Sequence, residues 1–252
     1  MRRKSCKSLD NVDRSSFMNI PCDEFANINL YPRYYAELAR KVEEMAEMET
    51  FILFAAPVIN YFEEEQQDQY LSVVEKPMDL GTVAHSTRSG EYLFLWQFIQ
   101  DVDLIRSNCI LYYGDSGELV PIANQINSEM ATIVSSVIGQ PFTTTMFNQI
   151  VAGTFTKKAP DFPCVDLLAG MMTYIPEDKL GRTVRRLIEH AGIEIEEGAE
   201  RLDVDITALS VDNFLWLWSE ARRLSSIAKN RRDGVAKYVA SAAESYEQKN
   251  AD

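Results

Sequence analysis

The sequence predicts an all-α protein with one bundle of four amphipathic helices followed by a smaller helical unit. Four segments between residues 35 and 137 carry apolar residues at intervals of three and four, the spacing of a helix with one buried face. Proline and glycine separate these segments, and only one later stretch alternates apolar and charged residues. Four helices packed around one apolar core satisfy this pattern.

The composition favours a binding protein over an enzyme. The 252 residues are 46% hydrophobic, and no stretch approaches the roughly 18–20 apolar residues of a membrane span. A net charge of −13 disfavours nucleic-acid partners, whose affinity comes mostly from cations, and favours a basic partner. The four scattered cysteines indicate reduced thiols of an intracellular protein, and no metal, phosphate-binding or nucleophile motif is present. We therefore expect no catalytic residue, metal, cofactor or membrane partner.

The first helix and the segments beside it can be predicted from local pattern. Residues 1–30 mix basic and polar residues without a period and are predicted to be a flexible arm, while residues 28–34 can pack on the first helix. Residues 51–77 break the helical period with prolines and the polar run Glu63–Gln67, so we expect a long loop, with that run solvated. The helix between them has the apolar positions Tyr35, Leu38, Ala39, Val42, Met45 and Ala46.

Three further helices complete the bundle. The second starts near Asp79, the third comes after Gly90, and the fourth comes after a turn at 114–117. The apolar face of the third is Tyr92, Leu95, Phe98, Ile99, Val102, Ile105, Cys109 and Tyr112. That of the fourth is Leu119, Ile122, Ala123, Ile126, Met130, Ile133, Val134 and Val137. Residues 139–162 are predicted to be a linker, from which Phe142, Phe147, Ile150 and Phe155 can pack back on the bundle.

A second unit of three helices is predicted at residues 163–226. Its last helix is capped by Ser210 and has the core face Phe214, Leu217, Trp218, Ala221 and Leu224. Before it, residues 201–206 alternate apolar and charged side chains, which predicts one short, half-exposed strand. The tail at 227–252 is polar and alanine-rich, and we expect it to be partly helical.

Several motifs of the bundle match a known family when they are taken together. They are Pro57-Val58, Tyr70, Pro77-Met78-Asp79-Leu80-Gly81-Thr82-Val83, Tyr92, Phe98-Ile99-Gln100-Asp101-Val102, Asn108-Cys109 and Tyr112. In this order and spacing they strongly resemble a bromodomain, the left-handed four-helix module that binds acetyl-lysine, and we place that domain at residues 31–138. The long loop then corresponds to the family's ZA loop, and the turn at 114–117 to its BC loop.

The second unit carries a further match. Its stretches are Pro176-Glu177-Asp178-Lys179-Leu180-Gly181-Arg182-Thr183-Val184, Leu202-Asp203-Val204-Asp205-Ile206 and Leu209. They look like the extraterminal (NET) domain, which comes after the bromodomains in the BET family of chromatin readers. The two resemblances together imply a BET-like nuclear protein with one bromodomain, acting in transcription or chromatin regulation.

The bromodomain resemblance also implies a binding pocket. An acetyl-lysine reader needs an apolar slot with a few hydrogen-bonding groups at its floor. By resemblance, Val58 and Leu119 line the walls, Phe54 lies at the mouth, and Tyr70 holds a water that bridges to the acetyl carbonyl. The implied pocket is Phe54, Val58, Tyr70, Cys109, Tyr112, Tyr113 and Leu119.

One position departs from the family. Tyr113 stands where bromodomains usually have an asparagine that donates to the acetyl oxygen, and Asn108 matches a different, structural asparagine. A tyrosine hydroxyl also donates, but from a longer arm. A buried acceptor left unsatisfied costs about 1–3 kcal/mol, or roughly 5- to 150-fold in affinity. Two interpretations stay open: weak or altered binding of acetylated histone tails, or a plugged pocket in a structural subunit of a complex.

The extraterminal resemblance implies a second site. In that family a partner peptide adds a strand beside the domain's own, here Leu202, Asp203, Val204, Asp205 and Ile206. The two aspartates would pair with lysines or arginines, and the apolar residues with apolar side chains, of peptide motifs from chromatin proteins. Arg201 replaces an acidic residue of the family, which puts strict lysine selectivity in doubt. The alternative is a strand that pairs only internally.

Overall fold

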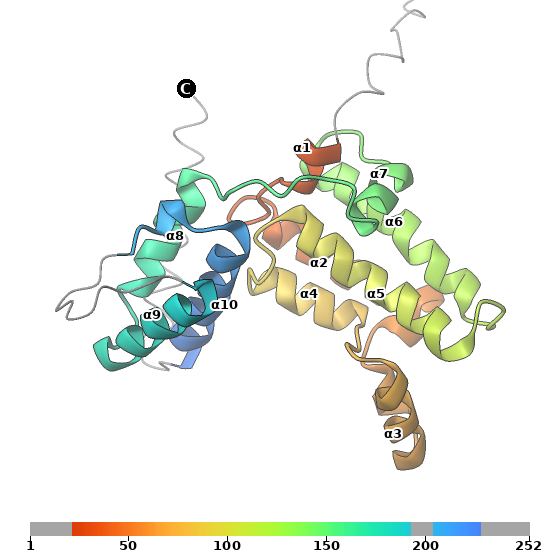
Figure 1. The fold of residues 1–252 in the computed structure, drawn as a ribbon. Coiled ribbons are helices and arrows are strands. Elements are labelled where there is room, and N and C mark those ends of the chain that lie inside the picture. The colour runs from red at the N-terminus through yellow and green to blue at the C-terminus, as the bar shows by residue number, and fades with distance from the viewer. Residues whose placement is uncertain (1–21, 193–203, 228–252) are drawn as a thin grey trace, which may run out of the picture.

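The computed structural model describes residues 22–192 and 204–227, and every regular element within these ranges is a helix (Figure 1). The predicted all-α class is therefore confirmed. None of the helices in these ranges combines the length and the apolar character needed to cross a membrane.

Four helices form the bundle, as the apolar spacing predicted. They are α2 (Tyr35–Ala46), α4 (Leu80–Arg88), α5 (Leu95–Tyr113) and α6 (Val120–Ile138). Asp79 starts α4 by accepting a hydrogen bond from the Thr82 N–H at 2.8 Å, and α6 ends where Gly139 takes the left-handed conformation with φ 68°. Each helix turns its apolar side chains into one shared core.

The segment predicted as a long loop at 51–77 contains short helices instead. They are η2 (Glu49–Phe54), η3 (Val58–Tyr61) and α3 (Glu64–Val73). Glu63 and Gln66 form a capping box that starts α3, so the run expected as a solvated loop is the cap and first turn of a helix. Tyr70 and Val74 are buried, while the rest of α3 extends away from the bundle (Figure 1).

Two contacts hold this segment against the bundle. The Gly81 N–H donates to the Ala55 carbonyl at 3.1 Å, and a Cβ added to Gly81 would lie 2.6 Å from that oxygen. The Asn108 amide donates to the Lys76 carbonyl at 2.8 Å. The polypeptide between α2 and α4 is thus fixed at both η2 and the end of α3, and its position defines the space in front of α5.

Part of the predicted N-terminal arm is packed. Helix α1 (Cys22–Ala26) buries Phe25, whose ring lies 5.5 Å from that of Phe142, and Leu30 is fully buried. The Leu30 N–H donates to the Leu93 carbonyl at 2.8 Å. The prediction of a flexible arm is therefore wrong for residues 22–30, because Phe25 and Leu30 are buried in the core although this segment shows no helical period. Residues 1–21 lie outside the described part of the chain.

The predicted linker at 139–162 contains helix α7 (Thr144–Val151), which lies against α5 and α6 (Figure 1). Thr143 caps it by accepting a hydrogen bond from the Met146 N–H at 3.3 Å. Phe147 and Ile150 are fully buried and Phe142 is 5% exposed, so the expected packing of these side chains on the bundle is confirmed.

The second unit consists of α8 (Phe162–Met172), α9 (Glu177–Ala191) and α10 (Val211–Ile227). It packs directly on the bundle through α10. The Trp218 indole N–H donates to the Gly90 carbonyl at 3.1 Å, and the Tyr31 ring lies edge-on to Trp218 at 5.9 Å. The apolar cores of the two units are therefore continuous.

The strand predicted at 201–206 is not formed by the residues of it that the structure describes. Residues 204 and 205 are irregular, and η4 (Ile206–Ala208) comes directly after them. The Asp205 carboxylate accepts hydrogen bonds from the Thr207 N–H at 2.9 Å and from its hydroxyl at 2.6 Å. Such local side-chain bonds compete with strand pairing, which explains the error. Residues 193–203 and 228–252 lie outside the described ranges, so Leu202, Asp203 and nearly all of the tail predicted at 227–252 do as well.

Candidate functional site

A small cavity lies at the end of the bundle where η2, η3 and α3 meet the C-terminal half of α5. Its volume is about 40 Å³. Six of the seven residues predicted for the pocket line it: Phe54, Val58, Tyr70, Cys109, Tyr113 and Leu119. The sequence prediction missed Ala56, Met78, Asp79 and Ile105, which also line it with Leu53 and Asn108. Met78 and Asp79 belong to the Pro77–Val83 motif, so the family signal was sufficient to find them.

Most of the lining is apolar and rigidly placed. Ile105 and Cys109 lie one turn apart on α5 and are 2% and 6% exposed. Phe54 ends η2 and Val58 begins η3, so the two tight turns carry these side chains to the same wall. Leu119, the residue before α6, completes the apolar lining. These walls suit a neutral group on an aliphatic stem.

Two polar residues of the lining are already used by the fold. Asn108 holds the Lys76 carbonyl, as a structural asparagine would, and both Asp79 carboxylate oxygens accept hydrogen bonds from Thr82, at 2.8 and 2.6 Å. The hydroxyls of Tyr70 and Tyr113 make no hydrogen bond with any other residue in the described ranges. These hydroxyls are therefore the groups that remain for a ligand.

Tyr112 contacts two residues of the pocket but does not line it. Its ring packs edge-on to Tyr70 at 5.1 Å and to Tyr113 at 4.9 Å, and it lies 5.6 Å from Phe62. The prediction that Tyr112 is a pocket residue is thus corrected to a role in orienting its two neighbours. Tyr113 itself is 41% exposed, so its ring stands at the mouth and does not fill the floor.

Burial keeps the polar hydrogens of this site in place. Desolvation, with a smaller contribution from Tyr113, raises the pKa of Tyr70 to about 12. Burial likewise raises the pKa of the Tyr113 hydroxyl and of the Cys109 thiol above their ordinary values. At neutral pH these groups are protonated donors rather than nucleophiles. No cluster of metal-ligating side chains occurs among the residues with described positions.

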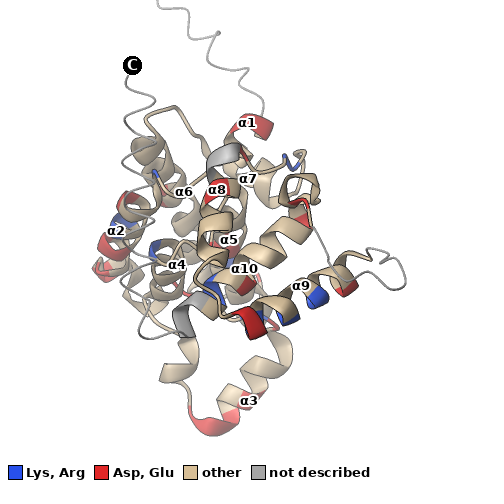
Figure 2. Cartoon of the chain, turned by 90° about the vertical axis from the view of Figure 1, so that its left-hand side faces the viewer, with Lys and Arg blue, Asp and Glu red and all other residues tan. Residues whose placement is uncertain are grey.

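The surroundings of the pocket are acidic. Residues 42–75 contain nine aspartates and glutamates and no lysine, arginine or histidine. Figure 2 shows acidic residues at the end of α3 that points away from the bundle. A basic peptide that approaches this end therefore meets an attractive field.

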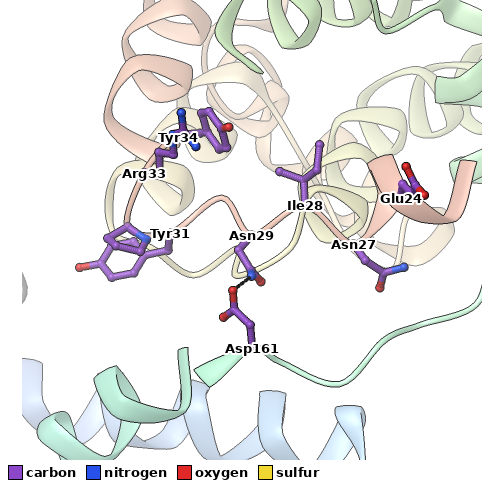
Figure 3. A pocket seen from close by; sticks show the side chains of 9 residues that line it. Glu24, Asn27, Ile28, Asn29, Tyr31, Arg33, Tyr34 and Asp161 are labelled. Atoms are coloured by element: carbon purple, nitrogen blue, oxygen red, sulfur yellow. Dashed lines mark hydrogen bonds between the residues drawn. The ribbon is translucent and has the colours of Figure 1, made fainter. Parts of the chain in front are cut away.

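A second cavity, of about 270 Å³, lies where the N-terminal segment meets the start of α8 (Figure 3). Its polar side chains mainly join the N-terminal segment to the stretch that leads into α8. The Asn29 amide donates to Asp161 at 2.5 Å, and Asp161 also accepts the Cys164 N–H that starts α8. Asn27 donates to the Thr156 carbonyl and accepts the Lys158 N–H, both at 2.8 Å. None of the residues predicted for either binding site lines it.

The described part of the predicted partner site is only partly available. Asp205 is exposed, but Thr207 occupies its carboxylate and holds the pKa of Asp205 below its usual value. Val204 and Ile206 are half-buried and pack against the core. Within residues 204–206 there is no strand for a peptide to extend.

The bundle is a helical module with a small cavity at the end where η2, η3 and α3 meet α5. Residues 24–125 match the family model of the bromodomain, a non-enzymatic reader fold. The match begins inside α1, so it includes residues that the sequence prediction assigned to the arm, and it ends before the second unit.

Several curated proteins are similar to parts of this chain. An ATPase family AAA domain-containing protein of Arabidopsis thaliana is 27% identical over 172 residues, which are 65% of this chain and 14% of the relative. The SWR1 complex bromodomain subunit bdf1 of Schizosaccharomyces pombe is 47% identical over 45 residues, 18% of the chain and 8% of the relative. The SAGA complex subunit SPT7 of Saccharomyces cerevisiae is 29% identical over 69 residues, 27% of the chain and 5% of the relative. The match spans 14% or less of each of these relatives.

Proposed function

We propose that the protein is a non-catalytic chromatin reader whose bromodomain binds acetyl-lysine weakly, using tyrosine hydroxyls in place of the usual carboxamide. The observation that carries this proposal is the assembly of six expected residues around one cavity, with Tyr113 at its mouth. Tyr70 and Tyr113 supply the two hydroxyl donors, and the apolar walls accept the aliphatic stem.

The size of the cavity supports weak binding. The cavity volume of about 40 Å³ is far less than the roughly 300–1,000 Å³ of common ligand sites. An acetyl group enters this space when the half-exposed Tyr113 ring swings outward and gives up its contact with Tyr112. That movement reduces the affinity below what a preformed slot would give.

The charge around the pocket supports a histone-like ligand. Acetylation removes the charge of one lysine, while the neighbouring lysines and arginines of a basic tail stay charged and face the acidic segment 42–75. The relatives named as subunits of the SWR1 and SAGA complexes support a role in chromatin and, with it, a nuclear location.

We also propose that the second unit is extraterminal-like and recruits basic and apolar peptides of chromatin proteins. Its support is the Lys179–Arg182 stretch within α9 and the three-helix arrangement. Because residues 204–206 are not a strand, this recruitment depends on a local rearrangement there, or on residues outside the described ranges.

The second candidate is a structural subunit whose bromodomain has lost acetyl-lysine binding. The small volume of the cavity favours it, and so does the continuous core, which makes the two units a single scaffold.

Titration of acetylated histone-tail peptides followed by NMR separates the candidates. We expect the wild type to bind weakly, Tyr113→Asn to bind about 5- to 150-fold more tightly, and Tyr113→Phe to bind more weakly than the wild type. Tyr61→Phe, at an exposed tyrosine that does not line the cavity, is the matched control. Tight wild-type binding that Tyr113→Asn weakens would contradict the proposal, and no binding by the wild type would favour the structural subunit.

A further inference from the structure

Three aromatic rings line the cavity beside Tyr113. They are Phe54 from η2, Tyr70 from α3 and Tyr113 from α5. Within the described ranges none of the three packs ring-to-ring on another of them, while Tyr70 and Tyr113 each contact the ring of Tyr112. The three rings therefore border a shared space from three different elements.

Tyr113 adds a ring to this site as well as a hydroxyl. By resemblance an asparagine is expected at its position, and a carboxamide has no aromatic face. Tyr113 is 41% exposed, so its ring is reached from solvent at the mouth of the cavity, whereas Tyr70 is 4% exposed and belongs to the wall. The face of an aromatic ring attracts a cation that lies within about 6 Å of its centre.

The charges around the cavity favour a positively charged ligand. The lining contains no lysine, arginine or histidine. Asp79 does line the cavity, and its carboxylate accepts from Thr82 but forms no ion pair in the described part of the chain. Lys76 lies nearby in the sequence, but its ammonium is paired with Asp101 at 2.5 Å. The segment 42–75 adds nine acidic residues and no basic one, so a cation is attracted and meets no like charge in the lining.

The same lining favours a methylated ammonium over the ammonium of ordinary lysine. An ordinary lysine head is strongly hydrated and carries three N–H groups that need acceptors, so apolar walls such as Val58 and Ile105 disfavour it. A trimethylammonium group keeps the charge but presents only methyl groups to its surroundings. The small volume of the cavity, about 40 Å³, places this group at the mouth beside Tyr113, with its methyl groups toward the apolar lining.

We propose that this cavity also binds trimethyl-lysine, through the rings of Tyr113, Tyr70 and Phe54. The inference rests on the proposed reader function for the location of the site, but it adds a second class of modified lysine and uses a different property of Tyr113. The hydroxyl of Tyr113 serves an acetyl carbonyl, while its ring serves a methylated cation.

Four short peptides test the proposal with the full chain observed by NMR. They share one uncharged sequence and differ only in the central residue, which is lysine, trimethyl-lysine, acetyl-lysine or the carbon analogue of trimethyl-lysine, in which a carbon replaces the charged nitrogen. We expect saturable shifts of the Tyr113 signals with the trimethyl-lysine peptide. It should bind about 2- to 5-fold more tightly than the lysine peptide and the carbon-analogue peptide.

Variants at Tyr113 separate the ring from its hydroxyl. Tyr113→Phe keeps the ring and should bind the trimethyl-lysine peptide as the wild type does, whereas Tyr113→Leu and Tyr113→Asn remove the ring and should bind it about 2- to 5-fold more weakly. The acetyl-lysine peptide should respond in the opposite way, with Tyr113→Asn binding more tightly and Tyr113→Phe more weakly. Tyr61→Leu removes an exposed ring outside the lining and should leave the binding of trimethyl-lysine unchanged.

Three results would overturn the proposal: no saturable shift at Tyr113 with the trimethyl-lysine peptide, equal binding of the carbon analogue, or equal binding by Tyr113→Leu. The two readings of the site fail independently. An acetyl-lysine peptide that does not bind contradicts the proposed function, while trimethyl-lysine binding that depends on the Tyr113 ring still supports the present inference.

Discussion

The two ends of helix α5 have different surroundings. Near its N-terminal end the second unit covers the bundle. Trp218 and Tyr31 are 1% and 6% exposed there, and the indole N–H of Trp218 donates to the Gly90 carbonyl. At its C-terminal end Leu111 and Tyr113 are 58% and 41% exposed, beside a cavity with two unused hydroxyls. The side chains near the first end are therefore buried in the fold, while those near the second end leave apolar surface and two hydroxyls exposed or unpaired among the described residues.

The exposed apolar residues sharpen this contrast. The large apolar side chains with high exposure in the described ranges are Met48, Ile52, Leu53, Tyr61, Leu71, Val73, Leu111 and Tyr113. All of them belong to the segments that build the pocket end, from the end of α2 to α3 and the last turn of α5. Exposed apolar residues that gather in one region are characteristic of interaction sites, which agrees with the proposed reader function of this end. The comparison shows that large buried side chains close one end of α5, while exposed apolar side chains gather near the other end, where the reader site is proposed.

The largest expected effect is at the closed end. Trp218→Ala removes a fully buried indole, its hydrogen bond to Gly90 and its ring contact with Tyr31, and should lower the free energy of unfolding by about 3–5 kcal/mol. Trp216→Ala, at a half-buried indole stacked on His190, is the control and should cost less. Urea unfolding followed by circular dichroism measures both. A loss below about 1 kcal/mol for Trp218→Ala would mean that the second unit does not stabilise the bundle.

A smaller effect on stability is expected where the segment between α2 and α4 contacts α4. A Cβ at Gly81 would lie 2.6 Å from the Ala55 carbonyl, so Gly81→Ala must push η2 away and should cost about 1–3 kcal/mol. Gly181→Ala in α9, where no atom lies within 4 Å of the added Cβ, should stabilise the protein by about 0.5–1 kcal/mol. Opposite shifts in Tm are the expected result. A stabilising Gly81→Ala would show that the close approach of η2 and α4 does not hold in solution.

The same contrast separates what the sequence could predict from what it could not. The bundle helices could be predicted from apolar spacing. The pocket residues could be predicted from bromodomain-like motifs, whose order and spacing are present although Tyr113 stands where bromodomains usually have an asparagine. The short helices α3 and α7 could not be predicted from apolar spacing, because each segment has too few buried apolar residues. These are Tyr70 and Val74 for α3, and Phe147 and Ile150 for α7.

Apolar spacing also could not predict which parts of the chain pack against each other. The apolar face of α10 predicts burial but not its partner, and Trp218 bonds to Gly90, which lies 128 residues earlier in the chain. The alternation at 201–206 predicts a strand only if long-range pairing exceeds the local bonds between Asp205 and Thr207, which instead favour η4. In both cases apolar spacing shows which side chains will be buried and does not show which residues they will contact.

A third prediction addresses the acidic side of the pocket end. Glu64→Gln/Asp68→Asn removes two exposed charges of α3, and a basic acetylated peptide should bind about 2- to 30-fold more weakly at low salt, since exposed charge pairs contribute about 0.2–1 kcal/mol each. Glu129→Gln, an exposed glutamate on α6, removes a charge away from the cavity and should change little. The difference between variants should shrink in roughly 0.5 M salt because exposed charges are screened. An equal loss with Glu129→Gln would show that only the net charge matters.

The smallest effect at neutral pH concerns Tyr70. Burial favours the neutral phenol and raises the pKa of Tyr70 to about 12 from an ordinary value near 10. A raised pKa in the folded state contributes stability that is fully present below about pH 10 and is lost as the pH rises through about 12. Peptide binding and stability should therefore show no Tyr70 titration between about pH 6 and 9, and phenolate absorbance in the wild type, compared with Tyr70→Phe, should appear only near pH 12. Ionisation of Tyr70 near pH 10 would place its hydroxyl in solvent and remove it as the protected donor at the open end.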